Sequence, residues 1–215
     1  MKLPTPIYRF LPSTSSVYPP SEDSFLLLDG LELSLSSLDL DPPCFIVEIG
    51  PGSGVISTAL SSVFPTSTTI SCDLNFQACT ETLITSSMNH TLLDVIHDDM
   101  LSSMSCRLSN KVDILLFNPP YVPTDYEEVC SAQRVQSISA SWAGGSNGVE
   151  VLNRFLFNLL PLVLSDSGSC FVVLLEENNP NLISRQLLEI SFNSEIVISR
   201  KCGIERLSIM RIWRK

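Results

Sequence analysis

Short apolar runs alternate with helix-like stretches along most of the chain, and this alternation limits the fold more than any other feature. The predicted strands span residues 44–49, 68–72, 93–97, 112–117, 169–175, 195–201 and 205–213. The predicted helices lie at 55–64, 76–88, 149–164 and 182–190, after a first helix that begins near Ser21. Strands that alternate with helices form a mainly parallel sheet covered on both faces. The short gap at Cys202-Gly203 predicts an antiparallel last strand. The sequence therefore predicts an α/β fold.

The size of the chain fits a single domain. Its 215 residues fall within the ordinary range for one domain, and 44% of them are hydrophobic, which is ample for one core. We expect one domain over residues 1–215, in which residues 1–40 form an arm and a helix that cover the pocket described below. No apolar run approaches the ~20 residues of a transmembrane helix, and the start lacks the apolar core of a signal peptide. We therefore expect no membrane association.

Cysteine usage and charge restrict the compartment and the partners. The seven cysteines are an odd number without a CxxC pair, which favours free thiols in a reducing compartment and no zinc site in this chain. The expected location is the cytoplasm, with the nucleus left open. A net charge of −10 repels phosphate backbones, so we expect no direct binding of nucleic acid. A basic protein partner is easier to reconcile with this charge.

A glycine-rich turn, Glu48-Ile49-Gly50-Pro51-Gly52-Ser53-Gly54, follows the first predicted strand. In a doubly wound sheet this crevice binds nucleotides. The spacing is G-x-G-x-G and not the G-x-G-x-x-G of dinucleotide sites, and Pro51 removes one backbone donor. A ligand that carries an amino-acid head group in place of a phosphate therefore fits better, and Glu48 is placed to pair with its ammonium group. A plain tight turn is the alternative.

Acidic residues follow the next two predicted strands. Asp73 lies 23 residues after Gly50, at about the distance where a carboxylate binds ribose hydroxyls. Asp98 is placed to accept a hydrogen bond from an adenine amino group, while the next backbone N–H, that of Asp99, donates to a ring nitrogen. The alternatives are a helix N-cap role for Asp73 and a plain turn role for Asp98.

The fourth predicted strand ends at Asn118-Pro119-Pro120-Tyr121, a stiff turn that is poor in hydrogen-bond donors. The Asn118 side-chain carbonyl and the Pro119 backbone carbonyl can accept hydrogen bonds, and the Tyr121 ring can stack on a planar group. Such a surface suits an amide, an aminopurine or an amine, and suits a carboxylate badly. A Pro-Pro loop end with Asn as a turn former is the alternative.

The residues singled out so far share one rim, at the carboxyl ends of four consecutive strands. With this set, the chain resembles the class I S-adenosylmethionine-dependent methyltransferases, which have a Rossmann-like, seven-stranded sheet. More narrowly, it resembles the eukaryotic branch of the HemK-like N5-glutamine methyltransferases of peptide release factors. The motifs that carry the resemblance are Tyr18–Ser24, Glu48–Gly54, Asp73, Asp98, Asn118–Tyr121, Trp142–Gly145 with Gly148, and Glu176–Pro180. Pro51 and Asp99 depart from the usual family pattern.

The resemblance implies a cofactor and a set of site residues. The implied cofactor is S-adenosyl-L-methionine, bound by Ser24, Glu48, Gly50, Gly52, Asp73, Leu74, Asp98, Asp99 and Asn118. The implied catalytic residues are Asn118, Pro119 and Tyr121, and the substrate-binding residues are Asn118, Pro119, Pro120 and Tyr121. No metal site is implied in this chain.

The resemblance also implies two partners. One is the substrate, a eukaryotic peptide chain release factor that is methylated on the side-chain amide of the glutamine in its Gly-Gly-Gln motif. The other is a small zinc-binding activator subunit, which forms a heterodimer along the sheet edge near the third strand. The apolar segment Leu92–Ile96 agrees with such an edge, and coverage by the chain's own helix is the alternative. The loop Val122–Asn147, with Trp142, is the expected substrate lip.

Other functions compete with this interpretation. An adenine-N6 DNA methyltransferase shares the Asn118–Tyr121 motif, but it needs a basic groove for a flipped base, which the charge of −10 opposes. A protein (histone) lysine methyltransferase fits the same acceptor surface. A non-catalytic scaffold is opposed by the intact Asn118–Tyr121 motif, Asp73 and Asp98. His97 is a candidate base, but its place at a strand end favours a structural or solvent-facing role.

Overall fold

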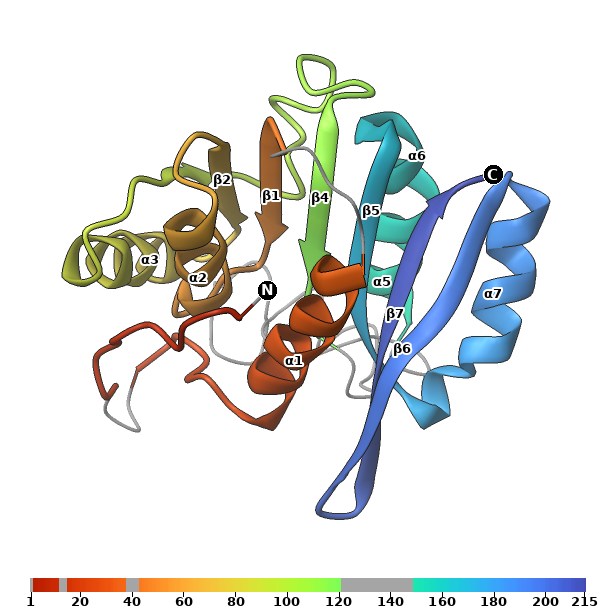
Figure 1. The fold of residues 1–215 in the computed structure, drawn as a ribbon, viewed down its shortest axis with the longest axis horizontal. Coiled ribbons are helices and arrows are strands. Elements are labelled where there is room, and N and C mark those ends of the chain that lie inside the picture. The colour runs from red at the N-terminus through yellow and green to blue at the C-terminus, as the bar shows by residue number, and fades with distance from the viewer. Residues whose placement is uncertain (1, 12–14, 38–42, 121–148) are drawn as a thin grey trace.

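Seven strands form one sheet in the computed structural model, which describes residues 2–11, 15–37, 43–120 and 149–215 (Figure 1). The strands are β1 (Phe45–Ile49), β2 (Thr68–Asp73), β3 (Asp94–His97), β4 (Val112–Phe117), β5 (Leu164–Leu175), β6 (Phe192–Cys202) and β7 (Glu205–Arg214). Their order across the sheet is β3-β2-β1-β4-β5-β7-β6. Only the pairs made by β7 are antiparallel among these strands. The predicted mostly parallel sheet with an antiparallel last strand is therefore confirmed.

Helices cover both faces of the sheet. The helical segments are α1 (Glu22–Ser37), α2 (Val55–Val63), α3 (Phe76–Met88), α5 (Glu150–Arg154), the π-helical turn η3 (Phe155–Leu159), α6 (Leu160–Val163), the 3-10 turn η4 (Glu176–Asn178) and α7 (Pro180–Glu189). In Figure 1, α1 and α2 lie in front of the sheet, with α5 and α6 behind it. Within the described ranges, no helix has both the length and the apolar character to cross a membrane.

The central strand β4 shows why both faces must be covered. Ile114 and Leu116 belong to the core beneath α1 and α2, whereas Leu115 and Phe117 belong to the core beneath α5, α6 and α7. All four side chains are buried. Successive side chains of a strand point to opposite faces, so a continuous apolar run has no face to offer to water.

The prediction of one continuous helix over residues 149–164 is wrong. This segment is divided into α5, η3 and α6, and β5 starts at Leu164 instead of 169. Pro161 supplies the physical reason, because it has no N–H to donate and its ring crowds the carbonyl four residues before it, which favours a widened turn. The pairing of β5 with β4 also shifts between Leu164 and Ser169, so the residues between them form an irregularity.

The N-terminal arm lies across α1 and α3 before it reaches the carboxyl edge of the sheet. The Leu3 N–H donates to Glu32 on α1 at 2.6 Å, and Asn89 at the end of α3 exchanges two hydrogen bonds with the backbone of Ile7. Further along, Asn75 Nδ2 donates to the Ser16 carbonyl at 2.8 Å. These contacts hold the arm beside the strand ends.

Two glycines with similar backbone angles provide a stability test. Gly54 has φ +76° and a Cβ there would lie 2.6 Å from Thr82 Cα, whereas Gly203 has φ +63° and open space around it. We expect Gly203→Ala to lower the free energy of unfolding by about 1–2 kcal/mol, the cost of the left-handed backbone alone. Gly54→Ala should cost about 3 kcal/mol or more, because α2 and α3 must also move apart. Urea denaturation of both variants measures the difference, and equal losses would contradict the packing argument.

Candidate functional site

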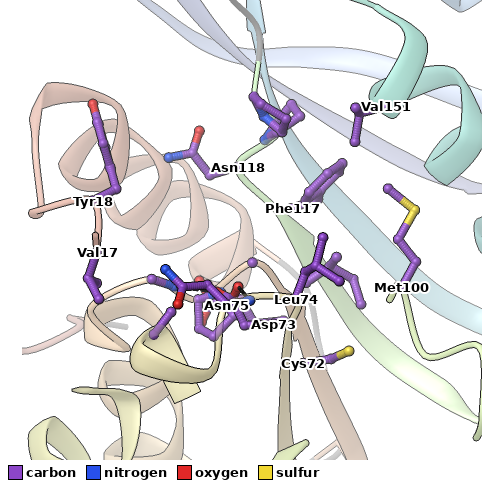
Figure 2. Close-up of a pocket in the computed structure, with 18 of the residues that line it drawn as sticks. Val17, Tyr18, Cys72, Asp73, Leu74, Asn75, Met100, Phe117, Asn118 and Val151 are labelled. Carbon is purple, nitrogen blue, oxygen red and sulfur yellow. Dashed lines mark hydrogen bonds between the residues drawn. The ribbon is translucent and has the colours of Figure 1, made fainter. Parts of the chain in front are cut away.

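A pocket of about 380 Å³ lies at the carboxyl ends of β1, β2, β3 and β4. It brings together every described residue that the sequence predicted for the site. These are Ser24, Glu48, Gly50, Gly52, Asp73, Leu74, Asp98, Asp99, Asn118, Pro119 and Pro120. Tyr121, Trp142 and the rest of the predicted lip at 122–147 lie outside the described residues. Figure 2 shows Tyr18 on the arm, facing the Asn118 side chain at the end of β4.

The glycine-rich turn is bonded to its own chain. The Gly50 N–H donates to the Cys72 carbonyl at 2.8 Å, the Gly52 N–H to Asp73 Oδ2 at 3.2 Å, and the Gly54 N–H to the Pro51 carbonyl at 2.8 Å. All three glycines have positive φ angles, between +53° and +76°. Each of these three N–H groups therefore already has an acceptor within the chain. Such a turn is a poor phosphate cradle.

Glu48 is a buried carboxyl group with two donors. Its Oε2 accepts hydrogen bonds from the Ser57 N–H at 2.9 Å and from the Ser57 hydroxyl, in the first turn of α2. Burial is the largest influence and raises the pKa of Glu48 to about 7, although both bonds from Ser57 oppose the rise and nearby Asp73 adds to it. The sequence predicts an ammonium group as the partner of the Glu48 carboxyl group, and it does not predict the hydrogen bonds from Ser57.

Asp73 connects the glycine-rich turn to the start of α3. Its Oδ2 accepts from Gly52, and its Oδ1 accepts from the Asn75 N–H at 2.8 Å. Burial raises the pKa of Asp73 above its ordinary value, and these two N–H donors oppose that shift. Asn75, and not Asp73, is the N-cap of α3, since its side chain accepts from the Gln77 N–H at 2.9 Å.

Asp98 organises the loop that follows β3. Its carboxylate accepts four hydrogen bonds, from the Asp99 N–H and the Ser102 hydroxyl on Oδ1 and from the N–H and hydroxyl of Ser103 on Oδ2. Partial burial raises the pKa of Asp98, but these bonds outweigh it, and the pKa lies below its ordinary value. The Asp99 N–H, which we expected to face an adenine nitrogen, is thus bonded to Asp98 at 2.8 Å.

The Asp99 side chain pairs with a residue that sequence reasoning missed. Arg154 on α5 donates to Asp99 Oδ2 at 2.8 Å, and both residues line the pocket. Arg154 is the one described cation in a lining that also holds six carboxyl groups. Those are Asp23, Glu48, Asp73, Asp98, Asp99 and Glu205. The Asp99 position, where the chain departs from the family pattern, therefore has a structural partner on α5.

One side of the pocket is apolar. Figure 2 shows Leu74, Met100 and Val151 on this side, close to Phe117. Beneath them, Cys72 accepts from the Leu101 N–H at 3.4 Å and donates to the Asp98 carbonyl at 3.2 Å. Burial raises the pKa of Cys72 to about 12, so it remains a thiol and keeps its donor. Such a wall suits a flat, weakly polar ring. Val151 reaches this side from α5, and no local signal in the sequence could have identified it.

Among the described residues that line the pocket, only Asn118 has a buried side-chain acceptor without a partner. The Oδ1 atom is inaccessible to solvent and accepts no hydrogen bond from any described residue. Buried polar atoms are satisfied in the large majority of cases, so an exception at a pocket wall indicates a binding function. The neighbouring prolines have no N–H groups to offer it.

Two further expectations concern His97 and metal ions. The His97 Nε2 lies 2.9 Å from the Leu74 carbonyl, and its ring meets Phe76 edge-on at 5.7 Å, so it has a structural role and does not line the pocket. In the described part of the chain, no group of three or more His, Cys, Asp or Glu side chains could hold a metal ion.

This strand order, with an acid-lined pocket at the carboxyl ends of the first strands, defines a class I methyltransferase. The family model of the methyltransferase small domain matches residues 27–141. The chain belongs to this family, and to its branch that includes the HEMK2 methyltransferases. Methyltransferase HEMK2 of Mus musculus is 39% identical over 212 residues, which cover 97% of this chain and 96% of the mouse protein.

Two further relatives have names that state a substrate. The eRF1 methyltransferase catalytic subunit mtq2 of Schizosaccharomyces pombe is 36% identical over 211 residues, covering 92% of this chain and 89% of its own. A solved structure of the E. cuniculi Mtq2-Trm112 complex, described as responsible for methylation of the eRF1 translation termination factor, matches with a TM-score of 0.68 and 26% identity. It covers 94% of this chain and 100% of the matched chain.

The raised pKa of Glu48 predicts a pH-dependent stability. The folded protein holds a proton on this carboxyl group between the ordinary pKa of 4.5 and about 7, so the group's contribution to stability is fully present below 4.5 and is lost as the pH rises through about 7. Glu48→Gln removes this titration and keeps an acceptor for Ser57. The free energy of unfolding of the variant relative to the unaltered protein should rise by up to about 3 kcal/mol between about pH 5 and 8.

Urea denaturation at several pH values tests this prediction. The exposed Gln186 provides a control, because Gln186→Ala removes no titratable group and should shift stability equally at every pH. A constant difference between Glu48→Gln and the unaltered protein across the range would show that Glu48 does not titrate as described.

Proposed function

We propose that this methyltransferase modifies the side-chain amide nitrogen of the glutamine in the Gly-Gly-Gln motif of a eukaryotic peptide chain release factor. The proposed methyl donor is S-adenosyl-L-methionine, and the proposed active form is a heterodimer with a small zinc-binding activator subunit. The names of the mtq2 and Mtq2-Trm112 relatives support this assignment. We also propose that the enzyme works in the cytoplasm, with the nucleus as an open second location.

The observation that carries the proposal is the buried Asn118 Oδ1, which accepts no hydrogen bond from the part of the chain that the structure describes. An acceptor that is buried without a donor costs roughly 1–3 kcal/mol, and a ligand N–H that binds there recovers this free energy. A primary amide offers two N–H groups, one for Asn118 Oδ1 and one for the Pro119 carbonyl. A carboxylate offers none, so the same surface repels glutamate.

The proposed chemistry needs orientation more than proton transfer. An amide nitrogen is a poor nucleophile, because its lone pair is delocalised into the carbonyl group. Two fixed acceptors, Asn118 and Pro119, hold the amide N–H groups in the plane of the turn and stabilise the positive charge that develops on nitrogen. Pro119 is buried and the turn is stiff, so the acceptors are oriented before the substrate arrives. The predicted stacking by Tyr121 concerns a residue outside the described ranges.

The lining of the pocket fits S-adenosylmethionine. When bound, this cofactor supplies an electrophilic methyl group on a positively charged sulfur. Carboxyl groups at the strand ends favour its cationic parts and its ribose hydroxyls, in the proposed roles of Glu48 and Asp73, while Leu74 and Met100 offer an apolar wall for a planar base. The volume of about 380 Å³ lies within the usual range for small-molecule sites.

Lysine is the second candidate acceptor, and the six carboxyl groups of the lining favour a cationic side chain. A lysine ammonium has no free lone pair until it loses a proton, whereas an amide needs no prior deprotonation. The glutamine assignment is therefore preferred. Replacing the glutamine of Gly-Gly-Gln by alanine in the substrate separates the two, because methylation of a lysine would persist.

The proposed activator surface is the open edge of the sheet at β3. Among the described strands, β3 pairs only with β2, so its other edge offers backbone groups to a second chain. Apolar side chains flank this edge, with Leu92 89% exposed and Phe76 62% exposed. The alternative of an edge covered by the chain's own helix is not found among the described residues.

Asn118→Ala tests the amide clamp directly. We expect the transfer of labelled methyl to a release factor to fall at least about a hundredfold, because one of the two acceptors is lost. Binding of S-adenosylmethionine, measured by calorimetry, should survive. Asn181→Ala, at an exposed asparagine away from the pocket, is the control and should keep full activity. Undiminished turnover by Asn118→Ala would eliminate the assigned role.

Leu92→Glu tests the activator surface. The side chain is almost fully exposed, so the fold should be unaffected, but a charge on this edge should weaken co-purification with the activator subunit by about tenfold or more. The matched control is Leu188→Glu on α7, which is 52% exposed and lies far from this edge. If both variants retain the subunit equally, the partner binds elsewhere.

A further inference from the structure

The β6–β7 hairpin reaches past the carboxyl ends of the parallel strands. Figure 1 shows it as the longest extension at the lower edge of the sheet, on the same side as the tips of β1 and β4. A two-residue turn, Gly203-Ile204, joins Cys202 to Glu205, which are paired in the ladder. Glu205 also lines the pocket. The turn therefore stands at the rim through which a large substrate must approach.

The tip of this turn carries an exposed apolar side chain. Ile204 is 99% exposed, and a Cβ added to Gly203 would meet no atom within 4 Å. Gly203 has φ +63°, as expected at the first central position of a two-residue hairpin turn. A lone exposed isoleucine is ordinary. A β-branched residue at the second central position of such a turn is less common, because turn residues such as Asn, Asp, Ser and Gly dominate there.

The base of the hairpin is braced on both sides. Arg200 on β6 binds Asp29 of α1 at 2.6 Å, and Arg206 on β7 lies 3.7 Å from Glu176 of η4. Close packing adds to this, since α1 approaches β7 so closely at Gly30 that a Cβ would lie 2.9 Å from Ile209. The tip is thus presented at a fixed position beside the pocket, and an apolar residue on a rigid support loses little entropy on binding.

The charge of the hairpin differs from that of the whole chain. Three of the 13 basic residues, Arg200, Lys201 and Arg206, lie within seven positions that hold one acid, Glu205, although the net charge of the chain is −10. Lys201 and Arg206 are exposed on either side of the turn. A complementary surface would be apolar at its centre and acidic at its border.

We propose that residues 201–206 form a docking element for the folded protein substrate. Ile204 inserts into an apolar patch on the release factor, next to the loop that presents the acceptor glutamine, and Lys201 meets an acidic side chain at the border of that patch. The proposal rests on the proposed function for the identity of the substrate. Its physical basis is that a pocket of about 380 Å³ has room for small molecules and side chains but not for a folded domain, so the rest of a folded factor must lie against the rim.

The test compares two substrates of the heterodimer, the intact release factor and a short peptide that contains Gly-Gly-Gln. Ile204→Asp should raise KM for the intact factor about tenfold, the usual effect of losing an anchor residue, and leave kcat unchanged because the side chain touches no reacting atom. The peptide is too short to reach the tip, so its kcat/KM should stay within about twofold. The matched control is Ile196→Asp, at a 43% exposed isoleucine further along β6, which should change neither substrate.

Two outcomes would overturn the docking element: an unchanged KM for the intact factor, or equal losses for factor and peptide. A direct binding titration of the factor to the heterodimer separates this failure from that of the proposed function. If the unaltered heterodimer transfers no methyl group to either substrate, the proposed function is wrong. The titration still decides the docking element, since Ile204→Asp either weakens binding about tenfold or leaves it unchanged.

Discussion

The register of three parallel strands determines where every part of the site lies. Ile49 at the end of β1 pairs with Cys72 on one side and Phe117 on the other. The next residues, Gly50, Asp73 and Asn118, therefore lie level with one another at the edge of the sheet and line the same pocket. A shift of one residue in either pairing would turn side chains to the opposite face, so the buried alternation of β4 protects the geometry of the site.

The acidic residues of the pocket have structural partners as well as predicted ligand roles. Asp73 links the glycine-rich turn to α3, Asp98 holds its own loop with four bonds, and Glu48 ties β1 to the first turn of α2. A carboxylate that is fixed in this way is oriented before any ligand binds, which lowers the entropy lost on binding. The same groups can therefore order the loops and keep oxygen lone pairs available to hydroxyl or ammonium donors.

The sequence predicted the sheet and the rim well, for physical reasons that are local. Apolar runs predict strands, and four residues follow such runs directly: Gly50, Asp73, Asp98 and Asn118. Parallel pairing of the strands is therefore enough to bring these residues to one edge of the sheet. Features that depend on distant segments could not be read in this way. Arg154 and Val151 reach the pocket only because α5 lies near the end of β4. The helix is divided at η3 because the effect of Pro161 on the backbone outweighs the helical periodicity of the residues around it.

A small pocket and a large substrate impose different demands, and the fold meets them with different elements. In the proposed function the pocket recognises a chemical group, and the Asn118 acceptor, which has no partner among the described residues, distinguishes an amide from a carboxylate through hydrogen bonding. Two acceptors cannot distinguish one glutamine from another, since every exposed glutamine carries the same amide. Selection among proteins must therefore come from surfaces outside the pocket, where separate contacts add to the affinity without altering the geometry at the reacting nitrogen. The rim that includes Glu205 is continuous with the β6–β7 turn, so a contact there can discriminate between folded substrates while the amide clamp remains the same for all of them.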